Sequence, residues 1–137
     1  MFGNHTRFEV INNGIDLKRF ITPENKANEY TSCINARFDP PKNPYFVVDV
    51  IDKLVKKESK IILEWIGTGY MEREIKQYTK KMQLEDHIKF LGTTKNVENV
   101  LWRNKYFLLP SQYEGLGIVL IEAQAAGLKC FISDKVG

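Results

Sequence analysis

Short apolar segments alternate with amphipathic segments of helical length along this chain, and this alternation restricts its fold more than any other feature. Strands are predicted over residues 8–11, 30–36, 60–66, 87–91, 106–109 and 129–132. Helices are predicted over residues 44–57, 71–82, 95–103 and 116–126, with one helical turn over 16–20. Strands that alternate with helices through short connections favour an α/β domain with a doubly wound, mostly parallel sheet.

The first long helix is the clearest amphipathic segment. Asn43 is a candidate N-cap and Pro44 suits the first helical position. Apolar residues recur along it every three to four positions, namely at Phe46, Val47, Val50, Ile51, Leu54 and Val55. We therefore expect these side chains to lie on one face that packs into the core.

Composition excludes several classes of protein. Charged residues make up 27% of the 137 residues and the net charge is only +3, which is too small to indicate nucleic-acid binding. No apolar run approaches the roughly 18 residues of a membrane span, and no signal peptide is apparent. Cys33 and Cys130 lack metal-ligand spacing. We expect a cytoplasmic protein with buried, reduced thiols and no metal site.

The predicted topology brings four loops to one edge of the sheet, because ligands of such folds bind beyond the carboxyl ends of the strands. The loops contain Arg37 and Lys42, residues 67–69, residues 92–95, and residues 111–117. Arg37 and Lys42 flank two prolines that stiffen their loop. They are either solvated surface charges or cations that grip a diphosphate.

Residues 111–127 concentrate the candidate chemistry. Gly115 and Gly117 form a turn before a helix whose first N–H groups have no partner within the helix and attract anions. Glu114 lies in this turn, and Glu122 lies within the helix. A carboxylate on such an apolar helix needs a partner if it is buried. Glu122 therefore either binds a pair of ligand hydroxyls, such as those of a ribose, or is exposed or paired within the fold.

Gly67 and Gly69 follow a strand and suggest a dinucleotide site. The third glycine of G-x-G-x-x-G is absent, because Glu72 occupies its position. The pair indicates either a tight turn between strand and helix or a close approach of the backbone to phosphate. An NAD-binding domain is disfavoured.

The segment from Glu114 to Leu128 resembles the E-x7-E signature of the retaining glycosyltransferases of family 4 (group 1), which have the Rossmann-like GT-B fold. Further motifs agree over nearly all of the chain. Residues 10–16 resemble the family's interdomain segment, Arg37 to Lys42 its R-x4-K loop, and residues 90–97 its base-side strand and loop. Lys129 departs from the pattern, because the family usually has proline there.

The resemblance implies that residues 1–137 are the donor-binding C-terminal half of such an enzyme. Arg37 and Lys42 are expected to neutralise the donor diphosphate, Glu114 to face the transferred sugar and Glu122 to bind the ribose. The other expected contacts are Gly115, Leu116, Gly117 and Ile118 near the phosphates, Gly67 in its turn, and Gly92 and Val97 near the base. The donor, a nucleotide-diphosphate sugar, is a substrate, so we expect no separate cofactor.

The resemblance also implies what the chain lacks. We expect a fragment without the N-terminal acceptor domain and the C-terminal end, inactive alone and associated with a membrane only as the full-length enzyme. A glycan or lipid-linked acceptor would bind through the missing domain, as in polysaccharide biosynthesis. A non-catalytic nucleotide-binding module remains the alternative.

Overall fold

A computed structural model describes residues 13–21, 27–115 and 117–136. The predicted strand at 8–11 and Leu116 lie outside the described residues. The five-stranded sheet has the order β3-β2-β1-β4-β5, and all its neighbouring strands are parallel. The strands are β1 Asn28–Asn35, β2 Ile62–Ile66, β3 Ile88–Gly92, β4 Asn104–Leu109 and β5 Lys129–Ile132. This confirms the predicted Rossmann-like α/β fold.

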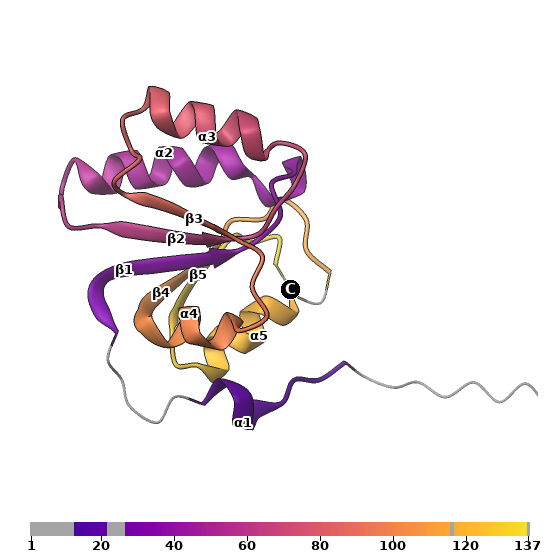
Figure 1. Ribbon diagram of the computed structural model, residues 1–137. Helices are drawn as coiled ribbons and strands as arrows, with labels where there is room; N and C mark the ends of the chain where they lie inside the picture. The colour runs from indigo at the N-terminus through magenta and orange to yellow at the C-terminus, as the bar shows by residue number, and fades with distance from the viewer. Residues whose placement is uncertain (1–12, 22–26, 116, 137) are drawn as a thin grey trace, which may run out of the picture.

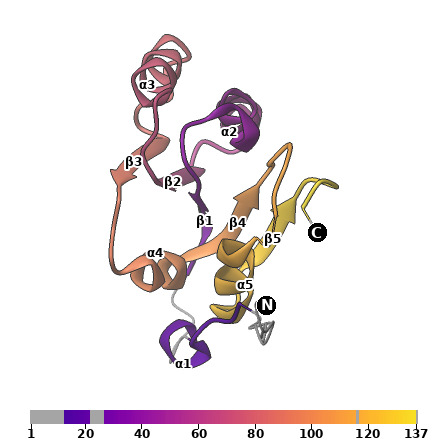
Figure 2. The ribbon, with the colours of Figure 1, turned by 90° about the vertical axis from the view of Figure 1, so that its right-hand side faces the viewer.

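Helices cover both faces of the sheet (Figures 1 and 2). One face carries α2 Pro44–Val55 and α3 Glu72–Lys81, and the other carries α4 Val97–Arg103 and α5 Ile118–Ala125. The single-turn helix α1 Leu17–Phe20 lies below α4 and α5, and the short 3-10 helix η1 Pro40–Lys42 precedes α2. The chain moves outward from β1 to β3 and then returns to β4 beside β1. This reversal makes the carboxyl ends of β1 and β4 the expected ligand position.

The core beneath α2 and α3 is built around two stacked aromatic rings. The rings of Phe38 and Trp65 lie 4.6 Å apart between centroids. The indole Nε1 of buried Trp65 donates to the Ala36 carbonyl at 3.1 Å. This contact fixes the loop after β1 to the neighbouring strand β2.

The core beneath α4 and α5 contains one of the two predicted thiols. Cys33 is fully buried and packs in a cluster with Phe20, Phe107 and Ala123. Burial raises the pKa of the Cys33 thiol. Cys130 is also free but only half-buried. The prediction of buried thiols therefore holds for Cys33 alone.

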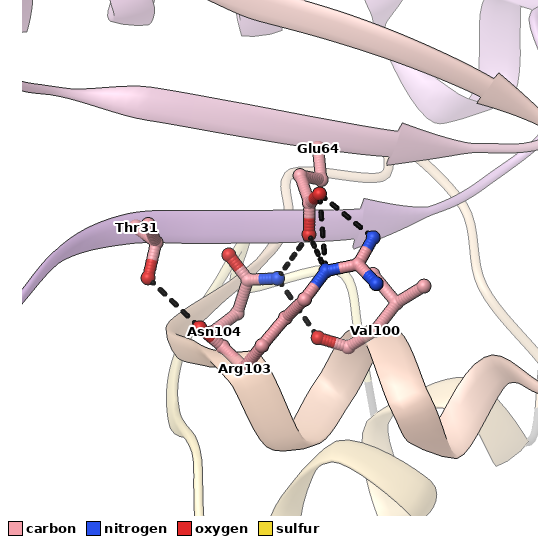
Figure 3. A network of polar contacts seen from close by, with 5 residues as sticks. All are labelled: Thr31, Glu64, Val100, Arg103 and Asn104. Atoms are coloured by element: carbon pink, nitrogen blue, oxygen red, sulfur yellow. Dashed lines mark hydrogen bonds and ion pairs between the residues drawn. The ribbon is translucent and has the colours of Figure 1, made fainter. Parts of the chain in front are cut away.

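A polar network joins α4 to the sheet (Figure 3). The Arg103 guanidinium, at the end of α4, donates to both carboxylate oxygens of Glu64 on β2, at 2.8 to 3.1 Å. The Asn104 amide donates to the same carboxylate at 2.6 Å and to the Val100 carbonyl at 2.8 Å. Thr31 on β1 donates to the Arg103 carbonyl at 3.2 Å. The network holds three strands and one helix together.

The predicted core face of α2 is partly wrong. Phe46 is 49% exposed and Leu54 39%, whereas Val48 is buried although the pattern did not include it. Among the described residues, no helix covers β4 and β5 on this side (Figure 2). The outer flank of α2 therefore borders an open apolar groove of about 640 Å³ with Tyr106 and Phe131 on its sheet side.

The start of α2 also differs from the prediction. Pro44 occupies the first helical position, as expected, but the Asn43 side chain makes no capping hydrogen bond. Asn43 instead adopts a left-handed conformation with φ of 53° and donates its backbone N–H to the Pro40 carbonyl at 2.9 Å. Its role is to turn the chain from η1 into the helix.

Candidate functional site

Two loops meet beyond the carboxyl ends of β1 and β4. The backbone N–H of Gln112 donates to the Pro41 carbonyl at 2.7 Å, which joins the loop after β4 to η1. The N–H of Ser133 donates to the Leu109 carbonyl at 3.2 Å, and Glu114 pairs with Val136 in an isolated bridge. The backbone therefore holds the glycine turn between the proline loop and the segment after β5.

Lys42 and Glu114 form an ion pair where these loops meet. The Lys42 Nζ donates to Glu114 Oε2, and the two side chains are only 18% and 15% exposed. The hydroxyl of buried Ser111 also donates to Glu114 Oε2, at 3.3 Å. Lys42 is therefore paired with a carboxylate of the neighbouring loop.

Arg37 is placed differently from Lys42. Its side chain is 76% exposed, and its guanidinium lies 2.8 Å from the carboxylate of Asp39. Asp39 is buried, and its Oδ1 has no hydrogen-bond partner among the described residues. The guanidinium is therefore tethered at the mouth of the site yet remains accessible to an incoming anion.

The loops after β1 and β4 border an open pocket of about 370 Å³. It brings together five of the residues predicted from sequence: Arg37, Lys42, Glu114, Gly117 and Ile118. Gly117 has φ of 46° and directly precedes α5. The first N–H groups of this helix lack partners within it, so the pocket combines two cations with a partly positive helix start.

Gly67 and Gly92 lie beside the pocket rather than in its lining. The Gly67 N–H donates to the Gly92 carbonyl at 2.8 Å, which joins the ends of β2 and β3. A Cβ on Gly67 would lie 2.2 Å from the Ala36 carbonyl oxygen, and one on Gly69 would lie 2.6 Å from that of Phe38. Close packing against the loop after β1 thus accounts for both glycines without a ligand.

Glu122, Val97 and Gly115 do not line the pocket either. Glu122 is half-buried on α5, one turn beyond Ile118. Burial raises the pKa of the Glu122 carboxyl, the positive charge of Arg19 opposes this rise, and the negative charge of Glu98 adds to it. Val97 begins α4 and packs against the core beneath α4 and α5, and Gly115 is exposed.

Comparison with known proteins gives the family. The sequence model described as "Glycosyl transferases group 1" matches residues 16–137. The chain belongs to this family. The matched range contains Arg37, Lys42, Glu114, Glu122 and every described strand.

Two curated relatives show the extent of the likeness. The chain is 32% identical to the putative glycosyltransferase EpsF of Bacillus subtilis, over 95% of this chain and 37% of the relative. It is 28% identical to an Escherichia coli UDP-Gal:alpha-D-GlcNAc-diphosphoundecaprenol alpha-1,3-galactosyltransferase, over 96% of this chain and 38% of that one. The chain thus spans less than two fifths of the length of either relative.

Solved structures agree on the fold. The chain is similar to Anabaena HepE, solved in complex with UDP and glucose, with a TM-score of 0.80 and 21% identity over 94% of this chain and 39% of HepE. This likeness confirms the predicted Rossmann-like fold of a GT-B enzyme.

The structure adds three polar residues that sequence reasoning missed. Asn35 ends β1 and lines the pocket, Ser111 contacts Glu114, and Asp39 pairs with Arg37. The positions of Ser111 and Asp39, each within a few residues of a predicted site residue, were the only signal in the sequence. Both contacts lie within one loop, since Asp39 is two residues from Arg37 and Ser111 is three residues from Glu114, but their geometry follows only from the folded loops.

Within residues 13–21, 27–115 and 117–136, no three His, Cys, Asp or Glu side chains gather as a metal site requires. In the same ranges, no helix is long and apolar enough to cross a membrane.

Proposed function

We propose that this chain binds a nucleotide-diphosphate sugar and that the full-length protein transfers the sugar to an acceptor with retention of anomeric configuration. The observation that carries the proposal is the pocket at the β1–β4 reversal, where Arg37 and Lys42 converge with the start of α5. Two cations and a helix N-terminus are complementary to a diphosphate.

The diphosphate is assigned to Arg37, Lys42 and the backbone of Gly117 and Ile118. Exposed Arg37 meets the incoming ligand, and Lys42 exchanges its partner Glu114 for a phosphate oxygen. Cleavage of the bond between sugar and diphosphate leaves negative charge on the departing phosphate. Fixed cations and helix N–H groups stabilise that charge as it develops, which lowers the barrier.

Glu114 is assigned to the transferred sugar. Its carboxylate lies against Lys42 and Ser111, at the end of the pocket where the glycine turn begins. Released from Lys42 by a diphosphate, it accepts hydrogen bonds from sugar hydroxyls. Such contacts orient the anomeric carbon toward the acceptor, and orientation of this kind contributes several kcal/mol to catalysis, about 7 to 11 in favourable cases.

The nucleoside is assigned to the neighbouring wall formed by α5, α4 and the loop after β3. Glu122 accepts hydrogen bonds from the two ribose hydroxyls, and residues near Gly92 and Val97 contact the base through the backbone. Half-burial of Glu122 supports this assignment, because a desolvated carboxylate gains from two hydroxyl donors.

The relatives support a sugar donor and a lipid-linked acceptor. The Escherichia coli relative is named for UDP-Gal and a diphosphoundecaprenol acceptor, and HepE was solved with UDP and glucose. Because the chain spans less than two fifths of its relatives, we assign the acceptor to parts of the full-length protein outside these 137 residues. In this proposal the full-length enzyme works in the cytoplasm at a membrane surface.

A thermal-shift panel of the purified chain tests donor binding. UDP, GDP, ADP, NAD and the corresponding nucleotide sugars are compared at millimolar concentration. One nucleoside diphosphate should raise the melting temperature, since a ligand at 100 times its Kd stabilises the native state by about 2.7 kcal/mol. The Glu122→Ala variant should lose this response.

The matched control is Lys56→Ala, which removes an exposed cation paired with Asp52 far from the pocket. It should respond to nucleotides like the wild type, whereas Lys42→Ala should not. A wild-type chain that no nucleoside diphosphate stabilises contradicts the proposed donor site. A response to NAD alone would indicate a dinucleotide-binding domain instead.

A further inference from the structure

Helix α1 places one arginine against the nucleoside side of the site. Phe20, its last residue, is buried among residues of α4 and α5, and its carbonyl accepts a hydrogen bond from Trp102 Nε1 at 2.8 Å. Asp16 caps the turn by accepting from the Lys18 N–H at 3.0 Å. These contacts anchor α1, so Arg19 has a defined position although its side chain is 45% exposed.

Arg19 joins two parts of the segment that follows β3. Its Nε and Nη2 donate to Glu98 Oε2 at 3.0 and 2.8 Å. The same Nη2 donates to the Lys95 carbonyl at 2.6 Å. Lys95 lies in the loop between β3 and α4, and Glu98 lies in the first turn of α4. One guanidinium therefore ties the loop to the helix it leads into.

The opposite end of this loop is tied to the sheet. The Gly92 carbonyl accepts from the Gly67 N–H at the end of β2, and within the loop the Asn96 N–H donates to the Thr94 hydroxyl at 3.1 Å. Arg19 thus supplies the contact at the helix end of the loop. Charge-assisted hydrogen bonds of this kind are stronger and shorter than neutral ones.

Arg19 also influences two carboxyl groups whose pKa values are shifted in opposite directions, downward for Glu98 and upward for Glu122. Its hydrogen bonds lower the pKa of Glu98. Burial raises the pKa of Glu122, the Arg19 charge from α1 lowers it, and the Glu98 charge from α4 raises it. The cation thus favours the ionised form of both groups.

We propose that Arg19 is a positioning residue for the donor nucleoside: from α1 it holds the loop at 93–96 through the Lys95 carbonyl and the first turn of α4 through Glu98, beside the helix that carries Glu122. The inference rests on the proposed function, since it assumes that Glu122 meets the ribose. Arg19 itself touches no reacting atom. It acts through the Lys95 carbonyl, Glu98 and the charge on Glu122.

A purely structural role for Arg19 is the competing explanation. Exposed ion pairs contribute little to stability, so such a role would have only a small effect. The two explanations differ in the titration of Glu122. Carboxyl ¹³C NMR of the ligand-free chain measures this titration, with Glu122→Gln assigning the signal. Arg19→Ala should shift the Glu122 pKa upward, whereas Glu98→Gln should shift it downward because it removes a nearby negative charge. Arg19→Lys should keep the pKa closer to that of the wild type.

Loop order and nucleotide affinity give two further readouts. Arg19→Ala should speed amide hydrogen exchange over residues 95–97. It should weaken binding of the nucleoside diphosphate found in the thermal-shift panel by about two- to fivefold, the effect of one exposed charge pair. The weakening should grow as the pH falls, because more of Glu122 becomes protonated. Lys56→Ala is the control for losing an exposed cation, and it should change none of these quantities.

The inference is overturned if folded Arg19→Ala protein shows an unchanged Glu122 pKa and unchanged exchange at residues 95–97. It is also overturned if that variant binds the nucleotide as the wild type does. A wild-type chain that binds no nucleotide contradicts the proposed function, and the Glu122 titration then decides the Arg19 coupling alone.

Discussion

The Lys42 ammonium and the Glu114 carboxylate, 72 positions apart in the chain, form an ion pair at the candidate pocket. Each group belongs to a loop that follows a different strand, β1 for Lys42 and β4 for Glu114. In the proposed function, a diphosphate that binds Lys42 competes with this carboxylate, which would couple ligand binding to the contact between the two loops.

Glu114→Gln should raise the affinity for a nucleoside diphosphate that carries no sugar. The substitution frees Lys42 and removes a negative charge from the pocket, so binding should tighten by about fivefold, equivalent to ~1 kcal/mol. Isothermal titration calorimetry measures the effect. Asp52→Asn, which frees Lys56 on α2, is the isosteric control and should leave affinity unchanged. Weaker binding by Glu114→Gln would argue against competition between carboxylate and diphosphate.

Gly67→Ala should destabilise the fold severely. The new Cβ would lie 2.2 Å from the Ala36 carbonyl oxygen, and the backbone at Gly67 has φ of 140°. We expect a loss of about 2 to 4 kcal/mol in the free energy of unfolding, measured by urea denaturation. Gly14→Ala is the matched control, because its Cβ meets nothing within 4 Å. Equal stability of the two variants would show that the loop after β1 can move aside.

Glu64→Ala should cost about 2 to 3 kcal/mol of unfolding free energy, because it removes the acceptor for Arg103 and Asn104. The buried Asn104 amide would then keep only the Val100 carbonyl as acceptor. Chemical denaturation measures the loss. Lys56→Ala, which breaks an exposed pair, should change stability by less than about 0.5 kcal/mol. A similarly small loss for Glu64→Ala would mean that water replaces the carboxylate without penalty.

Glu122→Gln should stabilise the ligand-free chain in a pH-dependent way. The folded-state pKa of Glu122 is raised, chiefly by burial, so the protonated form is favoured in the native state. Its favourable contribution is present below the unfolded pKa and is lost as pH rises through the folded pKa. The variant should therefore melt above the wild type at pH 7, and the difference should shrink toward pH 4. A pH-independent difference would assign the effect to packing rather than charge.

Most secondary structure was predictable, because its signals are local. The strand at Lys129–Ile132 has the predicted bounds, and the bounds of the other described strands lie within two residues of the predicted ones. The spacing of apolar residues did not correctly predict which side chains of α2 are buried. Phe46 and Leu54 have the spacing of core residues, but they lie on the side of α2 where β4 and β5 are uncovered.

The site was predictable in part for a similar reason. Parallel strands end at one edge, so Arg37, Lys42, Glu114, Gly117 and Ile118 were expected together and do line one pocket. The roles assigned to them, and those of Glu122, Gly115, Gly92 and Val97, remain predictions. Gly67 has a packing explanation that needs no ligand. The sequence indicated Asp39 only through its position two residues after Arg37, and it did not indicate Arg19 as a partner of the site.

The alternation of strand and helix patterns determined the α/β class, the parallel sheet and the edge at which the candidate residues gather. These properties could be predicted because the apolar and amphipathic patterns that indicate them are local in the sequence, and because parallel strands end at one edge of their sheet. Only the tertiary structure decided that Lys42 meets Glu114 and that Arg19 meets Glu98. Such pairs depend on the strand order that places β4 beside β1, and on the packing of α1 against α4 and α5. Both arise from contacts between segments more than 70 residues apart.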